Sequence, residues 1–329
     1  MPPSGNILQL RVLSRAQLHL LEWYAANKRQ LPWRETRDPY RIWVSEMMLQ
    51  QTRVAAVLEH YRRFLERFPD VAELAAAAET DVLAAWSGLG YYRRARAMHA
   101  AARKIVEEFG GRFPRTAEEL ENLPGIGRYT AAAIASIAFG EPTAVVDGNV
   151  ERVLSRLLGH DLRDRAETWE YAEAFLQQEH AGDWNQAVME LGATVCVPAE
   201  PKCLICPIRK WCADPGREAK RPQEIRHKKE VTFRLAKRRG SVYLVQRSAT
   251  DKLMAGMWEL PACLDGQEGT LLYRVRHSIT NSDYNVQVVQ AESKSVCGGK
   301  WVATGSLREM ALTGLTRKIL RAANLWPVD

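Results

Sequence analysis

The sequence predicts two domains, an all-α domain followed by an α+β domain. Residues 14 to about 195 read as successive helices, because apolar residues recur there at spacings of three and four. Residues 214–239 then carry ten Lys or Arg against four Asp or Glu, and residues 231–305 are rich in strand formers. The expected domains are therefore residues 1–213 and 231–329, joined by a basic linker at 214–230.

Length and charge narrow the class of protein. A chain of 329 residues suits two domains, and 46% hydrophobic residues supply a core. The net charge of +7 permits binding to a polyanion such as DNA. The first residues lack the apolar stretch and small-residue cleavage site of a secretory leader, so we expect none, and no run of about 18 apolar residues is present. We expect a soluble intracellular protein of the cytoplasm or nucleoid, with no membrane partner.

Individual elements follow from local signals. Ser14 suits the cap of a first helix at 14–29, and the helical pattern from Asp38 continues to Phe68. In the second domain, Gly240 marks a hairpin turn. The remaining expected helices are 71–86, 93–109, 128–139, 149–158, 167–179, 183–195 and 312–323, and the further expected strands include 284–290 and 300–303.

Four of the six cysteines lie within 17 residues. Six, two and five residues separate Cys196, Cys203, Cys206 and Cys212. Four thiolates this close in sequence can converge on one inorganic centre, either a [4Fe–4S] cluster or zinc. Zinc ribbons usually show two C-x₂-C pairs, whereas this segment has one, which favours iron–sulfur.

The segment LPGIGRYTA (123–131) indicates an anion-binding turn. Gly125 and Gly127 allow backbone conformations that turn N–H groups outward at the start of the next helix. A phosphate would bind well there. The alternative is a plain turn between two helices, capped by glycine.

Two carboxyl groups are expected in contrasting environments. Glu46 is the only charged residue in IWVSEMMLQ (42–50), so burial should raise its pKa and make it a proton donor. Asp147 precedes a helix in AVVDGNVERVL (144–154), where N–H groups and the helix dipole keep it ionised. The alternatives are a surface Glu and a plain N-cap. Together, an acid and an anion are typical of glycosidic cleavage.

These motifs also carry a family resemblance. The cysteine loop and the LPGIG turn resemble those of the endonuclease III superfamily, whose helix-hairpin-helix motif binds a DNA phosphate. The segments LPWR (31–34), SEMMLQQT (45–52), GLGYYRRAR (88–96) and VVDGNVERVL (145–154) resemble the MutY family of adenine DNA glycosylases. The resemblance implies an all-α helix-hairpin-helix glycosylase domain with a structural [4Fe–4S] cluster at 196–212. It also implies a monomer that acts in base excision repair on double-stranded DNA containing mispaired adenine.

The resemblance assigns roles to residues. Glu46 protonates the adenine, and Asp147 faces the sugar, with retention through a covalent intermediate. Tyr129 stands where strand-cleaving relatives carry lysine, so we expect base removal without strand cleavage. Tyr129 is expected to hydrogen-bond near Asp147, and Asn149 to hold the same anion. The expected DNA contacts are Arg34, Leu49, Gln50, Gln51, Tyr91, Gly125 and Gly127, with the cysteine-loop residues Lys202, Arg209 and Lys210 on the backbone.

The C-terminal domain resembles the Nudix-like domain with which this family reads 8-oxoguanine. GMWELP (256–261) and residues 271–290 carry the likeness, while the clustered glutamates of a Nudix hydrolase are missing. Many relatives have Phe-Ser-His where this chain has Ile279-Thr280-Asn281. Thr280 and Asn281 are therefore the candidate lesion contacts, with weaker discrimination expected, and a plain hairpin turn is the alternative.

Three other functions fit parts of the pattern. An endonuclease III-like enzyme would act on pyrimidines and cut the strand, but Tyr129 and Glu46 argue against it. A thymine/guanine mismatch glycosylase shares the fold and can share the tyrosine. An iron–sulfur DNA-binding or redox protein without catalysis would not need both Glu46 and Asp147.

Overall fold

The computed structural model describes residues 14–162, 164–217, 226–248, 250–251, 253–263, 269–279, 281–291 and 298–327. These residues form two compact units. The first unit contains the described residues up to Tyr61 and those from Lys104 to Arg217. The second contains Arg62–Arg103 and the described residues from Arg226 onward. Each unit is described by itself.

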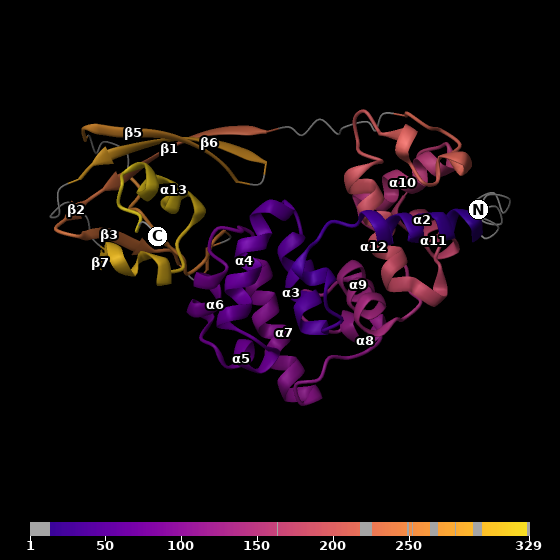
Figure 1. Ribbon diagram of the computed structural model, residues 1–329. Coiled ribbons are helices and arrows are strands. Elements are labelled where there is room, and N and C mark those ends of the chain that lie inside the picture. The colour runs from indigo at the N-terminus through magenta and orange to yellow at the C-terminus, as the bar shows by residue number, and fades with distance from the viewer. Residues whose placement is uncertain are drawn as a thin grey trace. The chain divides into compact units, whose positions relative to one another are not determined.

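The first unit is helical (Figure 1). Its α-helices are α2 (Ser14–Asn27), α3 (Pro39–Leu49), α8 (Ala117–Glu121), α9 (Arg128–Phe139), α10 (Gly148–Leu158), α11 (Arg165–Ala174) and α12 (Ala181–Thr194). Short 3₁₀ turns lie at η1 (Pro32–Arg34), η2 (Gln178–His180), η3 (Cys203–Ile205) and η4 (Arg209–Trp211). Helices α4 (Val54–Arg67) and α7 (Arg93–Phe109) have residues in both units.

Helix α9 is central to the first unit, where it packs against α3, α8 and α12. Its residues from Thr130 to Ile137 are all buried, and four of them are alanine. Small side chains let neighbouring helices approach closely, so α9 and α3 can bring their polar residues near one another. Helix α3 begins at a clear signal, because the Asp38 carboxylate accepts a hydrogen bond from the Tyr40 N–H at 2.9 Å and Pro39 occupies the first helical position.

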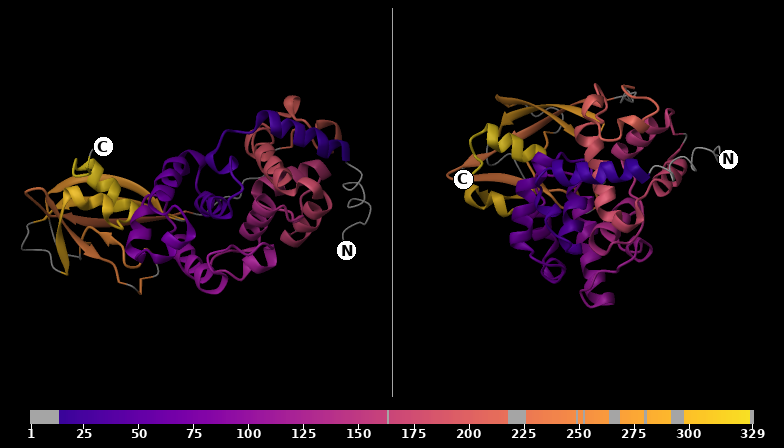
Figure 2. Two further views of the ribbon diagram at one scale, coloured as in Figure 1. Left: turned by 60° about the horizontal axis from the view of Figure 1, so that its bottom comes forward. Right: turned by 45° about the vertical axis from the view of Figure 1, so that its right-hand side comes forward.

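The second unit combines helices with two sheets. Helices α5 (Val71–Ala76) and α6 (Glu79–Ala85) belong to it, as do η6 (Thr304–Glu309) and α13 (Gly314–Ala322). One sheet has the order β1–β6–β5, with β1 (His227–Leu235) parallel to β6 (Ser282–Gln290) and β5 (Leu271–Ile279) antiparallel to β6. Its strands are among the orange ribbons of Figure 2. The other contains β2 (Lys237–Arg238), β3 (Ser241–Gln246), β4 (Trp258–Glu259) and β7 (Gly299–Ala303).

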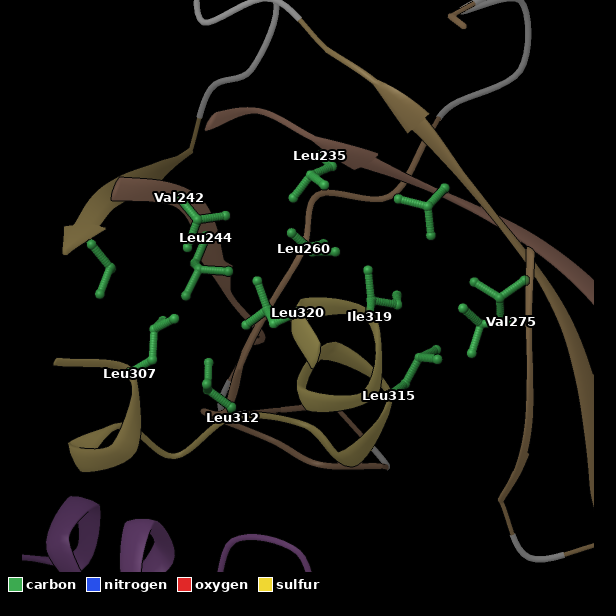
Figure 3. Close-up of a cluster of buried hydrophobic side chains, with 13 residues drawn as sticks. Leu235, Val242, Leu244, Leu260, Val275, Leu307, Leu312, Leu315, Ile319 and Leu320 are labelled. Carbon is green, nitrogen blue, oxygen red and sulfur yellow. The ribbon is translucent and has the colours of Figure 1, made fainter. Parts of the chain in front are cut away.

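The core of the second unit lies between these strands and α13. Figure 3 shows Leu315, Ile319 and Leu320 of α13 among side chains from both sheets. Ile319 and Leu320 are fully buried, as are Val242 and Leu244 of β3. The 3.6-residue repeat of α13 places its apolar residues on one face, which explains why this short helix closes the core.

The sequence-based expectations differ from the structure in three places. The expected helix at 71–86 is two helices, α5 and α6, separated by Ala77 and Ala78. The strand β1 begins at His227, inside the expected linker at 214–230, and residues 62–103 group with the C-terminal residues rather than with the other helices. The helical N-terminal region and the sheet-containing C-terminal region are confirmed. Within the described ranges, no helix is long and apolar enough to cross a membrane.

Candidate active site

Glu46 lies on the buried side of α3. All residues from Ile42 to Met48 are buried, and Glu46 is only 6% exposed. Burial raises the pKa of Glu46 to about 7, and the charge of Asp147 contributes to the rise. A hydrogen bond from Tyr129 and the charge of Arg34 act in the opposite direction. The carboxyl group is therefore a proton donor near neutral pH.

Tyr129 is the direct partner of Glu46. It lies in the first turn of α9, and its hydroxyl donates to Glu46 Oε2 at 2.8 Å and lies 3.5 Å from Met189 Sδ. The sequence-based expectation placed this hydrogen bond near Asp147. The structure gives Glu46 as the partner, because α9 packs against α3, while Asp147 lines the same pocket and its charge acts on Tyr129. Burial raises the pKa of Tyr129 well above its usual value, which keeps the phenol protonated.

Asp147 caps the N-terminus of α10. Its Oδ1 accepts hydrogen bonds from the backbone N–H of Asn149 at 2.9 Å and of Val150 at 2.8 Å. Its Oδ2 accepts one from Asn149 Nδ2 at 2.7 Å, as expected for Asn149. Both carboxylate oxygens are thus fixed in orientation by N–H donors.

Asn149 is itself held from two sides. Arg152 Nη2 donates to Asn149 Oδ1 at 2.8 Å and to the Gly192 carbonyl at 2.7 Å, and Arg152 Nε donates to the Cys196 carbonyl at 2.8 Å. Gly192 of α12 lies so close that an added Cβ would stand 2.6 Å from Asn149 Cβ. Helix α12 and the cysteine loop therefore fix Asn149, and through it Asp147.

One pocket of about 840 Å³, within the usual size range of small-molecule sites, brings most of the predicted residues together. Gln51 is exposed and adopts a left-handed φ of 56°, directly after α3. Gln50 donates from Nε2 to Thr130 Oγ1 at 3.2 Å. The predicted residues that line this pocket are Arg34, Glu46, Leu49, Gln50, Gln51, Gly127, Tyr129, Asp147 and Asn149.

Sequence reasoning missed a buried ion-pair cluster in the pocket wall. The Glu190 side chain is fully buried and accepts hydrogen bonds from Arg29 Nη2 at 2.6 Å and Arg34 Nη2 at 2.8 Å. Burial alone would raise the pKa of Glu190, but these hydrogen bonds outweigh it and hold the pKa at about 2. Glu190 is the only charged residue in NQAVMELGATV (185–195), the same signal that identified Glu46.

The glycine turn precedes α9 as expected. Gly125 has a φ of 74°, which favours glycine, and Gly127 is the N-cap of α9. Gly125, Gly127 and Arg128 are exposed. The N-terminal N–H groups of α9 are thus accessible to an anion.

The other predicted site residues are not among those that line this pocket. Tyr91 belongs to the second unit and is 44% exposed. Asn281 lies in the β5–β6 turn, is exposed, and accepts a hydrogen bond from the His227 N–H through its carbonyl at 2.9 Å. Thr280 lies outside the described residues.

The four predicted cysteines line one small cavity. Arg156 Nη1 lies 3.2 Å from Cys196 Sγ and also donates to the Cys196 carbonyl. Burial raises the pKa of Cys206 to about 11, and the other three cysteines add to the rise, so without a positive centre nearby the Cys206 group stays a neutral thiol. A metal centre would suit these four sulfur ligands. Among the described residues, however, no three His, Cys, Asp or Glu side chains are arranged to hold one metal ion.

Comparison with known proteins identifies a matching family and several relatives. Residues 44–178 match the HhH-GPD superfamily of base excision DNA repair proteins, a range that includes Glu46, Tyr129 and Asp147. The adenine DNA glycosylase of Mus musculus is 50% identical over 208 residues, covering 59% of this chain and 40% of that protein. The adenine DNA glycosylase of Arabidopsis thaliana is 35% identical over 304 residues, covering 77% and 48%.

A solved structure of a thermostable thymine-DNA glycosylase is also similar. It is 30% identical, with a TM-score of 0.57, and the match covers 62% of this chain and 95% of that chain. By contrast, the chain spans less than half the length of the two curated relatives above.

Proposed function

Because this chain belongs to the HhH-GPD superfamily of base excision DNA repair proteins, and within it to the MutY family, we propose that it removes adenine from mispaired DNA. The observation that carries the proposal is the shared pocket of Glu46 and Asp147. One carboxyl group is held near neutral pKa by burial, and the other is fixed by N–H donors. This contrast between a carboxyl group that carries a proton and a second one held by N–H donors suits base excision, and DNA binding alone does not need it.

The proposed reaction begins with proton transfer. The protonated Glu46 donates to adenine N7, and the bond between the base nitrogen N9 and sugar carbon C1′ breaks, its electron pair leaving with the base. The Asp147 carboxylate then forms a bond to the cationic C1′, as in retaining glycosidases. Water displaces Asp147 and gives up a proton to Glu46. Tyr129 has no amine, so no imine forms and the strand stays intact.

Five of the proposed DNA contacts line this pocket, namely Arg34, Leu49, Gln50, Gln51 and Gly127. The base must leave the helix stack to reach Glu46. Leu49, Gln50 and Gln51 at the end of α3 are placed to fill or read the gap, and Arg34 to contact the base. The Gly125–Gly127 turn would bind a backbone phosphate. In the second unit, Tyr91 would act as a wedge.

The C-terminal region is proposed as the Nudix-like module that reads the base opposite adenine, through Thr280 and Asn281. The β5–β6 hairpin supports this role, because its strands project a short turn containing Asn281. The Arg226 guanidinium donates to both Asp283 oxygens, at 2.9 and 2.8 Å, and Ser278 Oγ to Asp283 Oδ1 at 2.6 Å, which braces the base of the turn.

The cysteine loop is proposed to hold a [4Fe–4S] cluster, as in the endonuclease III family. Cys196, Cys203, Cys206 and Cys212 would ligate it, and the cluster would stabilise the loop's fold. Three basic side chains on the loop are exposed and would face DNA phosphates: Lys202, Arg209 and Lys210.

Single-turnover release of free base tests the proposed function. The substrates are duplexes with adenine opposite 8-oxoguanine, guanine or cytosine, and a duplex with thymine opposite guanine. We expect adenine release from the first two, and strand breaks only after alkali. Release of thymine without adenine would favour a thymine glycosylase, and strand breaks without alkali would contradict the role given to Tyr129.

A further inference from the structure

The loop of residues 87–92, hereafter the Tyr91 loop, has an unusual backbone. Gly88, Gly90 and Tyr91 have φ values of 113°, 69° and 48°. A tyrosine is disfavoured in the left-handed region, so its surroundings must hold it there. Tyr91 is nevertheless 44% exposed, so contacts to the loop backbone must contribute to holding it, in addition to any contact with its ring.

Part of the support comes from the flanking helices. Trp86 Nε1 donates to the Gly90 carbonyl at 3.1 Å. Arg94 Nη2 lies 3.3 Å from the carbonyls of Leu89 and Gly90, and its guanidinium stands over the Tyr91 ring, 5.3 Å from the centroid. These contacts anchor the centre of the loop from within residues 62–103.

The two ends of the loop are anchored on the C-terminal region. Ser87 Oγ donates to the Leu312 carbonyl at 3.2 Å, and Tyr92 Oη donates to the same oxygen at 3.1 Å. Tyr92 Oη also accepts from the Gly88 N–H at 3.4 Å, and Arg317 Nη1 donates to Ser87 Oγ at 3.3 Å. Ser87 and Tyr92 are only 9% and 4% exposed, so water cannot readily replace these partners.

Leu312 connects the loop to the core of the C-terminal region. Its side chain is fully buried in the cluster drawn in Figure 3, where it lies just before α13. Its backbone pairs with Trp258 of β4. The carbonyl that receives both hydroxyl groups is therefore part of a rigid core and not of a free turn.

We propose that the C-terminal segment 312–317 positions the Tyr91 loop, with Ser87 and Tyr92 as positioning residues for opening the duplex. This inference rests on the proposed function and deepens it. The C-terminal region then serves two purposes, since it reads the opposite base and also holds the tyrosine that separates the strands. Removing one buried hydrogen bond should lower the opening equilibrium constant about fivefold.

The test uses the full-length protein and a duplex in which 2-aminopurine replaces the target adenine. Its fluorescence rises when the base leaves the stack. We expect Tyr92→Phe to lower the opening equilibrium constant about fivefold, and Ser87→Ala combined with Tyr92→Phe to lower it further. Single-turnover release of adenine should fall in parallel, while the pH midpoint set by Glu46 stays unchanged.

Arg96→Ala is the matched control. The Arg96 side chain links residues 62–103 to the C-terminal region through the Ala255 carbonyl and also donates to Glu79. The Arg96 backbone N–H donates to the Tyr92 carbonyl at 3.1 Å, and Arg96→Ala keeps that bond while removing the side-chain contacts. Parent-like opening by Tyr92→Phe, or an equal loss in Arg96→Ala at equal thermal stability, would overturn the inference. A failure of the proposed function looks different, because the parent would then open the duplex without releasing adenine.

Discussion

Removing the Tyr129 hydroxyl should move the pH dependence of excision upward. The Tyr129 hydroxyl donates to Glu46 Oε2 at 2.8 Å and stabilises the ionised carboxylate. Hydrogen bonds to charged groups contribute about 1.5–3 kcal/mol, and one pKa unit corresponds to about 1.4 kcal/mol. Tyr129→Phe should therefore raise the pKa of Glu46 from about 7 by roughly one to two units.

The sign follows from the proposed role of Glu46. If only the protonated form donates to the base, excision should be fast at low pH and fall tenfold per pH unit above the pKa. In the parent the midpoint lies near the Glu46 pKa of about 7. In Tyr129→Phe the midpoint shifts upward, so the ratio of variant to parent rates rises with pH.

The midpoint is measured as single-turnover adenine release between roughly pH 5.5 and 9.5, a range that includes the expected Glu46 pKa of both the parent and Tyr129→Phe. Tyr171→Phe is the control, because Tyr171 is a fully buried tyrosine of the same unit that does not line the pocket. Its midpoint should match the parent's. An unchanged or lowered midpoint in Tyr129→Phe would refute the assignment of Glu46 as the acid.

Three further predictions concern packing and stability. Gly192→Ala should slow excision, because the added Cβ would displace Asn149. Gly182→Ala is its control, because the Cβ added there would meet the Ser136 carbonyl at 2.6 Å instead. At an equal loss of melting temperature, Gly192→Ala should slow excision more than Gly182→Ala. Glu190→Gln should destabilise the protein by about 3 kcal/mol in urea unfolding, because it leaves the charge of the largely buried Arg34 unpaired. A parent-like unfolding midpoint would contradict this. Glu46→Gln should raise the free energy of unfolding by up to about 3 kcal/mol at pH 8, because the parent must keep an ionised carboxylate buried at that pH. This gain over the parent should disappear below pH 4.5, the pKa of Glu46 in the unfolded chain, because the parent carboxyl group is then neutral in both states.

The sequence predicts much of this arrangement because its signals are local. The 3.6-residue repeat and the Asp147 cap can be read without knowing any tertiary contact, and both are present in the structure. Glu46 illustrates why the prediction of burial succeeded. The segment around Glu46 offers no polar side of the helix, because Trp43, Val44 and Met47 are apolar. When α3 is buried, Glu46 is therefore buried with it.

Other features depend on packing between distant segments. The partner of Tyr129 is Glu46 because α9 packs on α3, 83 residues away, and no local pattern indicates that pairing. Glu190 pairs with Arg29 across 161 residues, so its lone-acid pattern indicates burial but not its partner. The grouping of residues 62–103 with the C-terminal region also depends on distant contacts, such as those to Leu312.

The most direct test is single-turnover release of adenine by Glu46→Gln on a duplex with adenine opposite guanine. The amide keeps the shape of the side chain but has no acidic proton at neutral pH. We expect release to fall by about 10²–10⁴-fold relative to the parent, the usual contribution of a general acid. Release at the parent rate would show that Glu46 does not protonate the base, and the catalytic reading of this pocket would be wrong.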